Sequence, residues 1–252
     1  MASLNPGPAI PDRVVGTVAP GGRKTRSLTR RVRCLVHRIV PSRFPPVGVF
    51  DGLVEPDQIE HLFAIEALTN PRLRQEIGEI HLVAPEDRLT GPGTTPIMAA
   101  FCHPNRAGSR FSDGSYGIYY AALEEETAIA ESAHHRARFL RATAEPPLAL
   151  EMRRYVCQVA RTLVMVPADP NLGLLEPDDY RRAQAFGREQ RAAGAWGLFY
   201  PSVRRAGGRC IAALRPPALK PPAVQASHYR YYWNGRYIDR IERIQTLPLP
   251  AR

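Results

Sequence analysis

Residues 108–131 read GSRFSDGSYGIYYAALEEETAIAE and bring an arginine, a Gly-rich turn, two adjacent tyrosines and several carboxylates into one short stretch. Arg110 follows a Gly–Ser pair, where the backbone can approach a ligand closely and a guanidinium can grip phosphate oxygens. An ordinary surface arginine fits the same pattern. The stretch is therefore a candidate anion-binding site that composition alone does not establish.

Two further side chains of this stretch, Tyr120 and Glu131, each admit a structural and a chemical interpretation. Tyr120 shares a predicted strand face with Ile118, which suits a core tyrosine whose hydroxyl is hydrogen-bonded. Glu131 lies nearly opposite the apolar stripe of its predicted helix. A solvated surface residue has this position, and so does a carboxylate that projects into a wet cleft.

Metal chemistry is disfavoured, and we expect no metal. His134 and His135 follow Glu131, but the H-E-x-x-H motif is absent and adjacent histidines point in different directions from a helix. The dipeptide Cys102–His103 has no ligand spacing of its own. The four cysteines of the chain contain no C-x-x-C pair, so neither a zinc knuckle nor a disulfide framework is expected.

Standard nucleotide-binding and hydrolase motifs are missing. The sequence has neither G-x-x-x-x-G-K-[ST] nor G-x-G-x-x-G after a strand, so any nucleotide must be held by another route. Ser202 lacks a G-x-S-x-G frame, which argues against a nucleophile, although it can hydrogen-bond a ligand. The aromatic cluster at 228–233 resembles a base-stacking surface, but such clusters are more often core plus hairpin face.

The elements that must position these residues are short and mixed. Residue patterns predict strands at 33–41, 79–85, 116–122, 155–166 and 208–215, helices at 55–70, 124–140 and 178–194, a mostly irregular connection at 87–109, and a hairpin at Asn234–Gly235. Without a regular β-α-β rhythm, this succession predicts an α+β fold. We expect a single compact domain with a small, mixed or antiparallel sheet flanked by helices.

Charge is unevenly placed along the 252 residues, whose formal net charge is +10. Residues 1–33 hold Lys24 and six arginines against Asp12 alone, which is seven minus one, or +6. This Pro/Gly-rich start predicts a flexible basic arm, followed by one domain over 34–252. Such an arm either binds nucleic acid or an acidic partner or is a solvated tail.

The chain has the composition of a soluble protein. Its 44% hydrophobic content is enough to bury a sizeable core. No apolar run reaches the roughly 18 residues of a membrane span, and the N-terminus lacks a signal-peptide core. We therefore expect a cytoplasmic protein with reduced cysteines and no membrane contact.

Five segments in order resemble the RES family, the toxin half of bacterial RES–Xre toxin–antitoxin pairs, which is named for an Arg, a Glu and a Ser. The segments are HRIVPSRFPP, GSRFSDGSYGIYYAA, ETAIAE, GLFYPSVRRAGGRC and HYRYYWNGRYI. The resemblance spans about residues 34–242 and leaves out the basic arm. Residues 51–100 form an extended insertion relative to short members of the family.

The resemblance implies an ADP-ribosyltransferase-like fold and an enzyme that breaks the nicotinamide–ribose bond of NAD+, as a glycohydrolase or a phosphorylase. By position, the family arginine, tyrosine, glutamate and serine fall on Arg110, Tyr120, Glu131 and Ser202. Glu131 would stabilise the oxocarbenium-like ribose. Arg110 and the earlier Arg38 would bind the pyrophosphate, and Tyr120 would stack on or orient the nicotinamide ring.

The resemblance also implies a biological role and partners. Loss of NAD+ would arrest growth, and a neighbouring Xre-type helix-turn-helix antitoxin would neutralise the toxin. Toxin dimers are common in the family, so a homodimer is left open. Two alternatives remain at this stage: an ADP-ribosyltransferase that modifies a macromolecule, and a non-enzymatic nucleic-acid-binding protein motivated by the basic arm.

Overall fold

The computed structural model describes residues 13–14, 28–42 and 78–245. The helix expected at 55–70 and most of the basic arm lie outside these residues. The strands are β1 (Arg13–Val14), β2 (Leu28–Pro41), β3 (Tyr119–Ala122), β4 (Leu148–Met165), β5 (Gly197–Pro201), β6 (Arg209–Ala213), β7 (Leu219–Trp233) and β8 (Ile238–Ile244). The helices are α3 (Thr95–Cys102), α4 (Glu125–Ala142) and α5 (Arg181–Ala192), with short 3-10 turns η1 (Ile80–Leu82), η2 (Pro85–Asp87), η3 (Pro170–Leu172) and η4 (Pro216–Ala218).

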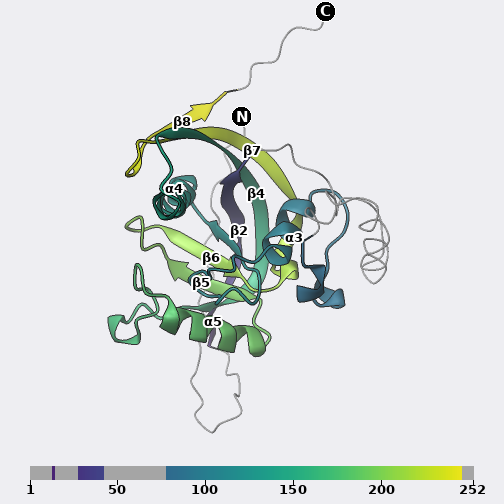
Figure 1. Ribbon diagram of the computed structural model, residues 1–252. Coiled ribbons are helices and arrows are strands. Elements are labelled where there is room, and N and C mark those ends of the chain that lie inside the picture. Colours follow the sequence, from purple (N-terminus) through teal and green to yellow (C-terminus); the bar gives the residue numbers. More distant parts are fainter. Residues whose placement is uncertain (1–12, 15–27, 43–77, 246–252) are drawn as a thin grey trace, which may run out of the picture.

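The strands form one curled, mixed sheet, which confirms the expected α+β class. Its order is β1-β2-β3-β6-β5-β4-β7-β8, and an additional pairing of β2 with β4 closes a ring through β2, β3, β6, β5 and β4. The β4–β5 pair is parallel, and the other pairs are antiparallel. Within the described residues the sheet has eight strands. Figure 1 shows β4 and β7 arching over α4, with α5 at the opposite end beside β5 and β6.

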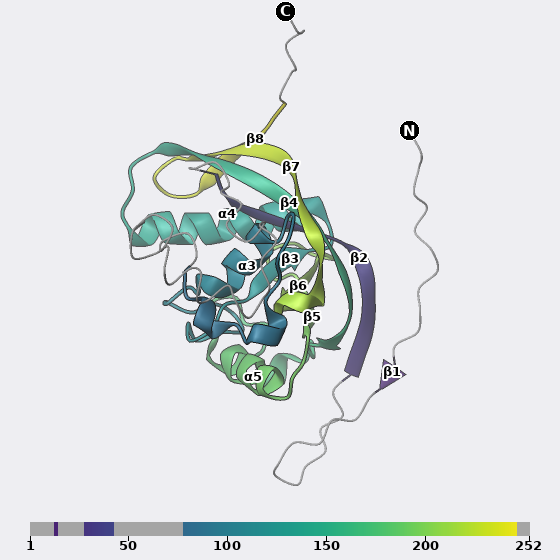
Figure 2. The ribbon, with the colours of Figure 1, turned by 90° about the vertical axis from the view of Figure 1, so that its right-hand side faces the viewer.

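Two strands are much longer than their sequence patterns indicated. β4 runs unbroken for 18 residues, where one or two strands were expected over 155–166. β2 begins at Leu28 and pairs with β4 from Thr29↔Val164 to Pro41↔Met152. Residues 28–33, which the sequence assigned to the flexible arm, therefore belong to the strand. Figure 2 shows β2 along one edge of the molecule, with α3, α4 and α5 on one side of it.

The segment before β3 corrects two predictions. Residues 79–85 form 3-10 turns instead of a strand, because Ile80 and Val83 are both buried at a spacing of three, which suits a turn rather than alternation. The connection expected to be mostly irregular over 87–109 contains one short helix, α3, which the sequence pattern did not predict. Its apolar residues Ile97, Met98 and Phe101 keep helical spacing and are buried.

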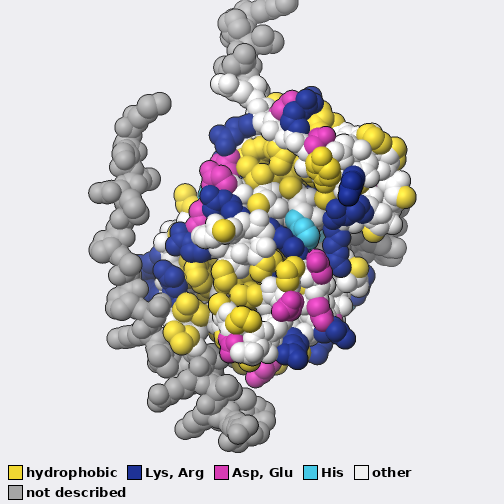
Figure 3. Space-filling model, turned by 90° about the vertical axis from the view of Figure 1, so that its left-hand side faces the viewer, with side chains coloured by type: hydrophobic (Ala, Val, Ile, Leu, Met, Phe, Trp, Pro, Cys, Tyr) yellow, Lys and Arg dark blue, Asp and Glu magenta, His cyan; other side chains and the backbone are white. Residues whose placement is uncertain are grey.

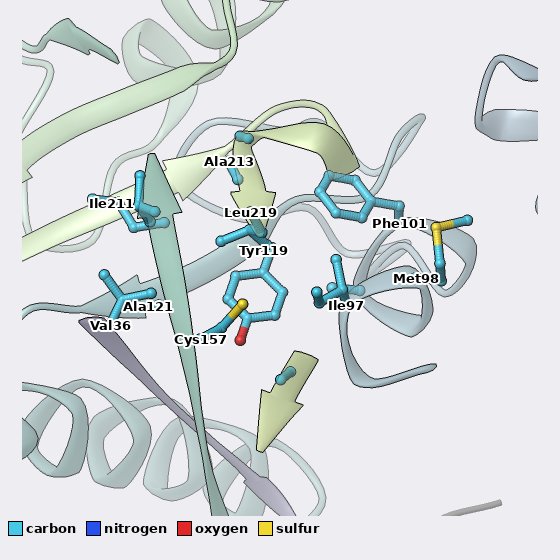
Figure 4. Packing of buried hydrophobic residues seen from close by; sticks show 14 of the residues in the cluster. Val36, Ile97, Met98, Phe101, Tyr119, Ala121, Cys157, Ile211, Ala213 and Leu219 are labelled. Carbon is cyan, nitrogen blue, oxygen red and sulfur yellow. The ribbon is translucent and has the colours of Figure 1, made fainter. Parts of the chain in front are cut away.

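The two faces of β3 enter two different cores, as the predicted alternation requires. Tyr119 and Ala121 face the core inside the strand ring, where Tyr119 is fully buried (Figure 4). Ala122 and the partly buried Tyr120 face the second core, between the sheet and α5. The strand begins at Tyr119 rather than at the expected Tyr116. This alternation separates the structural tyrosine, Tyr119, from the candidate site tyrosine, Tyr120.

Helix α4 lies against the arch with the apolar stripe that the sequence predicted. Ile129 and Ala133 pack against the cluster of Met152, Tyr229 and Tyr231, and Ala137 and Leu140 pack against Trp233. The predicted hairpin connects β7 to β8, and Gly235 has the positive φ of 93° that its turn requires. Packing on the arch thus fixes which side of α4 faces away from it.

Candidate active site

Glu131 and Ser202 meet at the middle of α4. The Ser202 hydroxyl, directly after β5, donates a hydrogen bond to Glu131 Oε1 at 2.6 Å. The Cys210 thiol at the start of β6 lies 3.8 Å from the same oxygen. The Glu131 side chain is only 21% exposed. The Glu131 carboxylate is therefore partly buried and hydrogen-bonded to the protein, and it is not a fully solvated surface residue.

The Ser202 hydroxyl is held in one orientation by its own turn. Its oxygen accepts hydrogen bonds from the backbone N–H groups of Arg204 and Arg205, each at 3.1 Å. The backbone N–H of Ser202 donates to Gly208 O at 2.8 Å. Because the lone pairs of the oxygen face the turn, its proton points at Glu131. Ser202 thus orients the carboxylate, in line with the absence of a nucleophile frame.

Tyr120 connects β3 to the loop that carries Arg110. Its hydroxyl oxygen accepts the backbone N–H of Phe111 at 3.0 Å and shares a hydrogen bond with Ser109 Oγ at 2.9 Å. Burial raises the pKa of the Tyr120 hydroxyl, which keeps it protonated at neutral pH. The Tyr120 hydroxyl therefore stabilises the conformation of the loop that carries Arg110.

Arg110 is buried, with 7% of its surface exposed. Its Nη1 donates to Glu176 O at 2.7 Å and to Leu174 O at 3.4 Å, and its guanidinium lies 4.7 Å from the centre of the Tyr180 ring. Arg110 thus holds the segment between β4 and α5 against the site. This contact was not evident in the sequence, since its partners are backbone carbonyls more than 60 residues away.

Helix α5 supports the Arg110 loop from behind. Gln184 Nε2 donates to Ser109 O at 3.0 Å. A Cβ on Gly187 would lie 2.2 Å from Phe111 O, so only glycine permits this close approach of helix and loop. The second core, which contains Ala183 of the same helix, completes the support.

Arg38 of β2 contacts β3 beside the candidate site. Its Nη1 donates to the backbone oxygen of Tyr120 at 3.0 Å, and its guanidinium lies 4.7 Å from the centre of the Tyr119 ring. Burial lowers the pKa of Arg38. The structure therefore brings the expected first-strand arginine directly onto the strand of the candidate site tyrosine.

Tyr200 of β5 lies between the two halves of the site and was missed in the sequence. Burial raises the pKa of its hydroxyl, and the nearby Cys210, Glu131 and Tyr120 act in the same direction, against Arg110. Its ring packs edge-to-face on Phe111, with centroids 5.0 Å apart. The available signal was its place two residues before Ser202, which puts both side chains on one face of an extended chain.

The site is positively charged around a pair of histidines. Burial lowers the pKa of His135 to about 4, and His134, Arg204, Arg136 and Arg110 add to the effect. Figure 3 shows a histidine patch flanked by Lys and Arg side chains on the face of the molecule that carries α4. This charge suits an anionic ligand such as a pyrophosphate. Arg136 and Arg204 were missed because nothing distinguishes them within arginine-rich sequence.

The acidic run at the start of α4 has a structural role. Glu124 precedes the helix and binds Arg209. The Glu125 carboxylate contacts Arg154, Arg243 and the Tyr229 hydroxyl. These contacts anchor the first turn of the helix that presents Glu131, so the assignment of the run to the helix start is confirmed.

Neither a metal-ligand cluster nor a membrane-spanning helix occurs in the described ranges. No group of three or more His, Cys, Asp or Glu side chains with the arrangement of a metal site is present among residues 13–14, 28–42 and 78–245. In the same part of the chain, no helix is both long and apolar enough to cross a bilayer.

Comparisons with known proteins identify a family and similar chains. The model of the RES domain matches residues 85–234, which include Arg110, Tyr120, Glu131 and Ser202. Uncharacterized protein y4oC of Sinorhizobium fredii is 36% identical over 213 residues, covering 81% of this chain and 85% of that protein. A chain in the crystal structure of the M. tuberculosis MbcT–MbcA toxin–antitoxin complex is 10% identical with a TM-score of 0.42, and 86% of each chain is covered.

Proposed function

Because the chain belongs to the RES domain family, we propose that it is an enzyme that breaks the nicotinamide–ribose bond of NAD+. The observation that carries the proposal is the hydrogen bond from Ser202 to the partly buried Glu131 Oε1, near Arg110, Arg136 and Arg204. It holds a carboxylate in a fixed orientation where positive charge develops on a substrate. Fixed charges of this kind are the largest single source of rate enhancement in many enzymes.

Glu131 acts on the ribose. As nicotinamide leaves, the ribose takes on oxocarbenium character, and a carboxylate beside it stabilises that charge. With Oε1 bound by Ser202, Oε2 is the oxygen directed to the substrate, where it also accepts a ribose hydroxyl. The partial enclosure of the side chain strengthens both interactions, because less water screens them.

The arginines bind the dinucleotide and replace a Gly-rich phosphate loop. Arg38 and Arg110 approach the site from β2 and from the loop before β3, and Arg136 and Arg204 add charge from α4 and from the turn after β5. Together they attract the two negative charges of a pyrophosphate. The Tyr120 hydroxyl is hydrogen-bonded to Phe111 of the loop, so it is the face of the Tyr120 ring that stacks on the nicotinamide.

The enzyme acts as the toxin of a toxin–antitoxin pair in the cytoplasm. Emptying the cell of NAD+ arrests growth, and an Xre-type helix-turn-helix antitoxin blocks the activity until it is removed. The family membership supports this role.

Nicotinamide release from NAD+ tests the activity. Purified protein is incubated with NAD+, with and without inorganic phosphate, beside Glu131→Gln and the matched control Glu126→Gln, an exposed glutamate of the same helix. We expect Glu131→Gln to lower the rate by about 100- to 1000-fold and Glu126→Gln to leave it near wild type. Intact NAD+ in every wild-type reaction would overturn the proposal, and transfer of labelled ADP-ribose to a protein or nucleic acid would replace it with a transferase.

Expression in a bacterial host tests the toxin role. Wild type should stop growth while the cellular NAD+ pool falls, and Glu131→Gln should permit growth at equal protein level. Coexpression of a helix-turn-helix protein encoded next to the gene should restore growth. Growth arrest with an undiminished NAD+ pool would contradict this role.

A further inference from the structure

His135 lies one helical turn after Glu131 and faces its second carboxylate oxygen. The distance from His135 Nε2 to Glu131 Oε2 is 3.9 Å, and half of the His135 side chain is exposed, so solvent reaches it. The other carboxylate oxygen, Oε1, is bound to Ser202. The imidazole therefore lies beside the oxygen that the proposed function directs to the ribose.

The separation of 3.9 Å is too long for a direct hydrogen bond but matches two acceptors that share one water. A water placed beside both atoms would donate one hydrogen to Oε2 and the other to Nε2, if His135 carries its own proton on Nδ1. The lone pairs of the water oxygen would then be free to face a third atom, as a nucleophilic water next to a general base requires.

We propose that Glu131 Oε2 and His135 Nε2 hold the water that attacks C1′ of the ribose, and that His135 accepts its proton. This inference rests on the NAD+-cleaving function proposed above and assigns water as the acceptor. The C1′–N bond breaks, and its electron pair leaves with neutral nicotinamide. The water oxygen forms the new C1′–O bond, and one of its protons passes to Nε2 and then to solvent.

Partial burial is the main cause of the lowered pKa of His135. The groups that face it act in the same direction: His134 and Arg136 on α4, Arg204 after β5 and Arg110 before β3, with the Glu131 carboxylate alongside. With its pKa lowered to about 4, the imidazole is neutral in the free enzyme at pH 7. A bound pyrophosphate offsets the arginines, which raises the pKa of His135 and makes it a stronger base only when substrate is present.

His134 does not take the same position beside Glu131. It is the neighbouring residue of the same type, and burial likewise lowers its pKa to about 4. The two rings are 5.4 Å apart at an angle of 76°. His134 Nε2 is buried without a hydrogen-bond partner among the described residues, whereas His135 Nε2 lies 3.9 Å from Glu131 Oε2.

Rescue by azide distinguishes a His135→Gln protein that has lost only its general base from one that has failed to fold. His135→Gln should hydrolyse NAD+ about 100-fold more slowly than wild type, whereas the control His81→Gln, at an exposed histidine outside the site, should stay near wild type. Azide is an anion that needs no proton removed, so it should restore nicotinamide release in His135→Gln, with ADP-ribosyl azide as the product. It should not restore Glu131→Gln, which lacks the charge that stabilises the ribose. Hydrolysis by His135→Gln at the His81→Gln rate, or no azide product, would overturn the inference.

Two further measurements distinguish a failure of this inference from a failure of the proposed function: nicotinamide release with and without phosphate, and the NMR titration of His135. If wild type releases no nicotinamide, the proposed function fails. If it does so only with phosphate and forms ADP-ribose-1″-phosphate, cleavage stands and the assignment of water is overturned. Proton NMR of the His135 ring should report a pKa that rises when ADP-ribose is added to Glu131→Gln, and an unchanged pKa would contradict the coupling to the pyrophosphate.

Discussion

Ser202 and Glu131 are 71 positions apart in the chain and are joined by a hydrogen bond of 2.6 Å from hydroxyl to carboxylate. The bond connects the end of β5 to the middle of α4. Its geometry is set by the turn at 202–208, which occupies the lone pairs of the hydroxyl. The orientation of the carboxylate thus depends on both the sheet and the helix.

Ser202→Ala should lower kcat by about 10- to 100-fold with little change in KM, because a hydrogen bond to a charged group contributes about 1.5 to 3 kcal/mol. The carboxylate stays in the site but loses its fixed orientation. Steady-state kinetics of NAD+ cleavage measure both constants. Ser115→Ala, in an exposed loop, is the control and should match wild type. An unchanged kcat in Ser202→Ala would show that Ser202 does not orient the Glu131 carboxylate for catalysis.

Tyr120→Phe should lower the free energy of unfolding by about 1 to 3 kcal/mol, since it leaves the Phe111 N–H without its acceptor. Tyr119→Phe is an unusually close control. The Tyr119 hydroxyl is buried without a hydrogen-bond partner among the described residues, so its removal should be neutral or stabilising. Urea denaturation compares the two variants. Equal effects would mean that the Tyr120 hydroxyl does not hold the loop.

Stability should fall as the pH drops from about 6.5 to about 4. The pKa values of His134 and His135 are lowered from 6.5 to about 4 in the folded protein. In this window the unfolded chain binds protons that the folded protein does not, so their contribution is full above pH 6.5 and is lost below it. Urea midpoints at pH 7 and pH 5 measure the drop. His134→Gln should reduce it, and the exposed-site control His81→Gln should not.

Glu125→Gln should destabilise the protein by about 3 kcal/mol, because it removes a mostly buried charge that faces Arg154, Arg243 and the Tyr229 hydroxyl. The neighbouring Glu126 is exposed, so Glu126→Gln changes the same net charge at little cost. Thermal unfolding of both variants measures the difference. Similar melting temperatures would show that the cluster does not anchor α4.

Local sequence patterns correctly predicted the elements whose buried side follows a regular period or whose turn has a typical sequence. The alternation of β3, the apolar stripe of α4 and the turn at Asn234–Gly235 are confirmed. Local patterns failed where burial did not follow a simple period. The turns at 80–87 and the short helix α3 lie among prolines and glycines that obscure their spacing, and the length of β4 depends on its pairing with β2 and β7.

For the site, the sequence by itself determined which residue types stand at 38, 110, 120, 131 and 202, and the order of motifs was enough to single them out. Only the tertiary structure decided what each one touches. Periodicity places Glu131 on the side of α4 away from its apolar stripe, but whether that side meets water or Ser202 depends on where the end of β5 lies. Contacts across 71 positions are set by sheet pairing and packing, which no local pattern records.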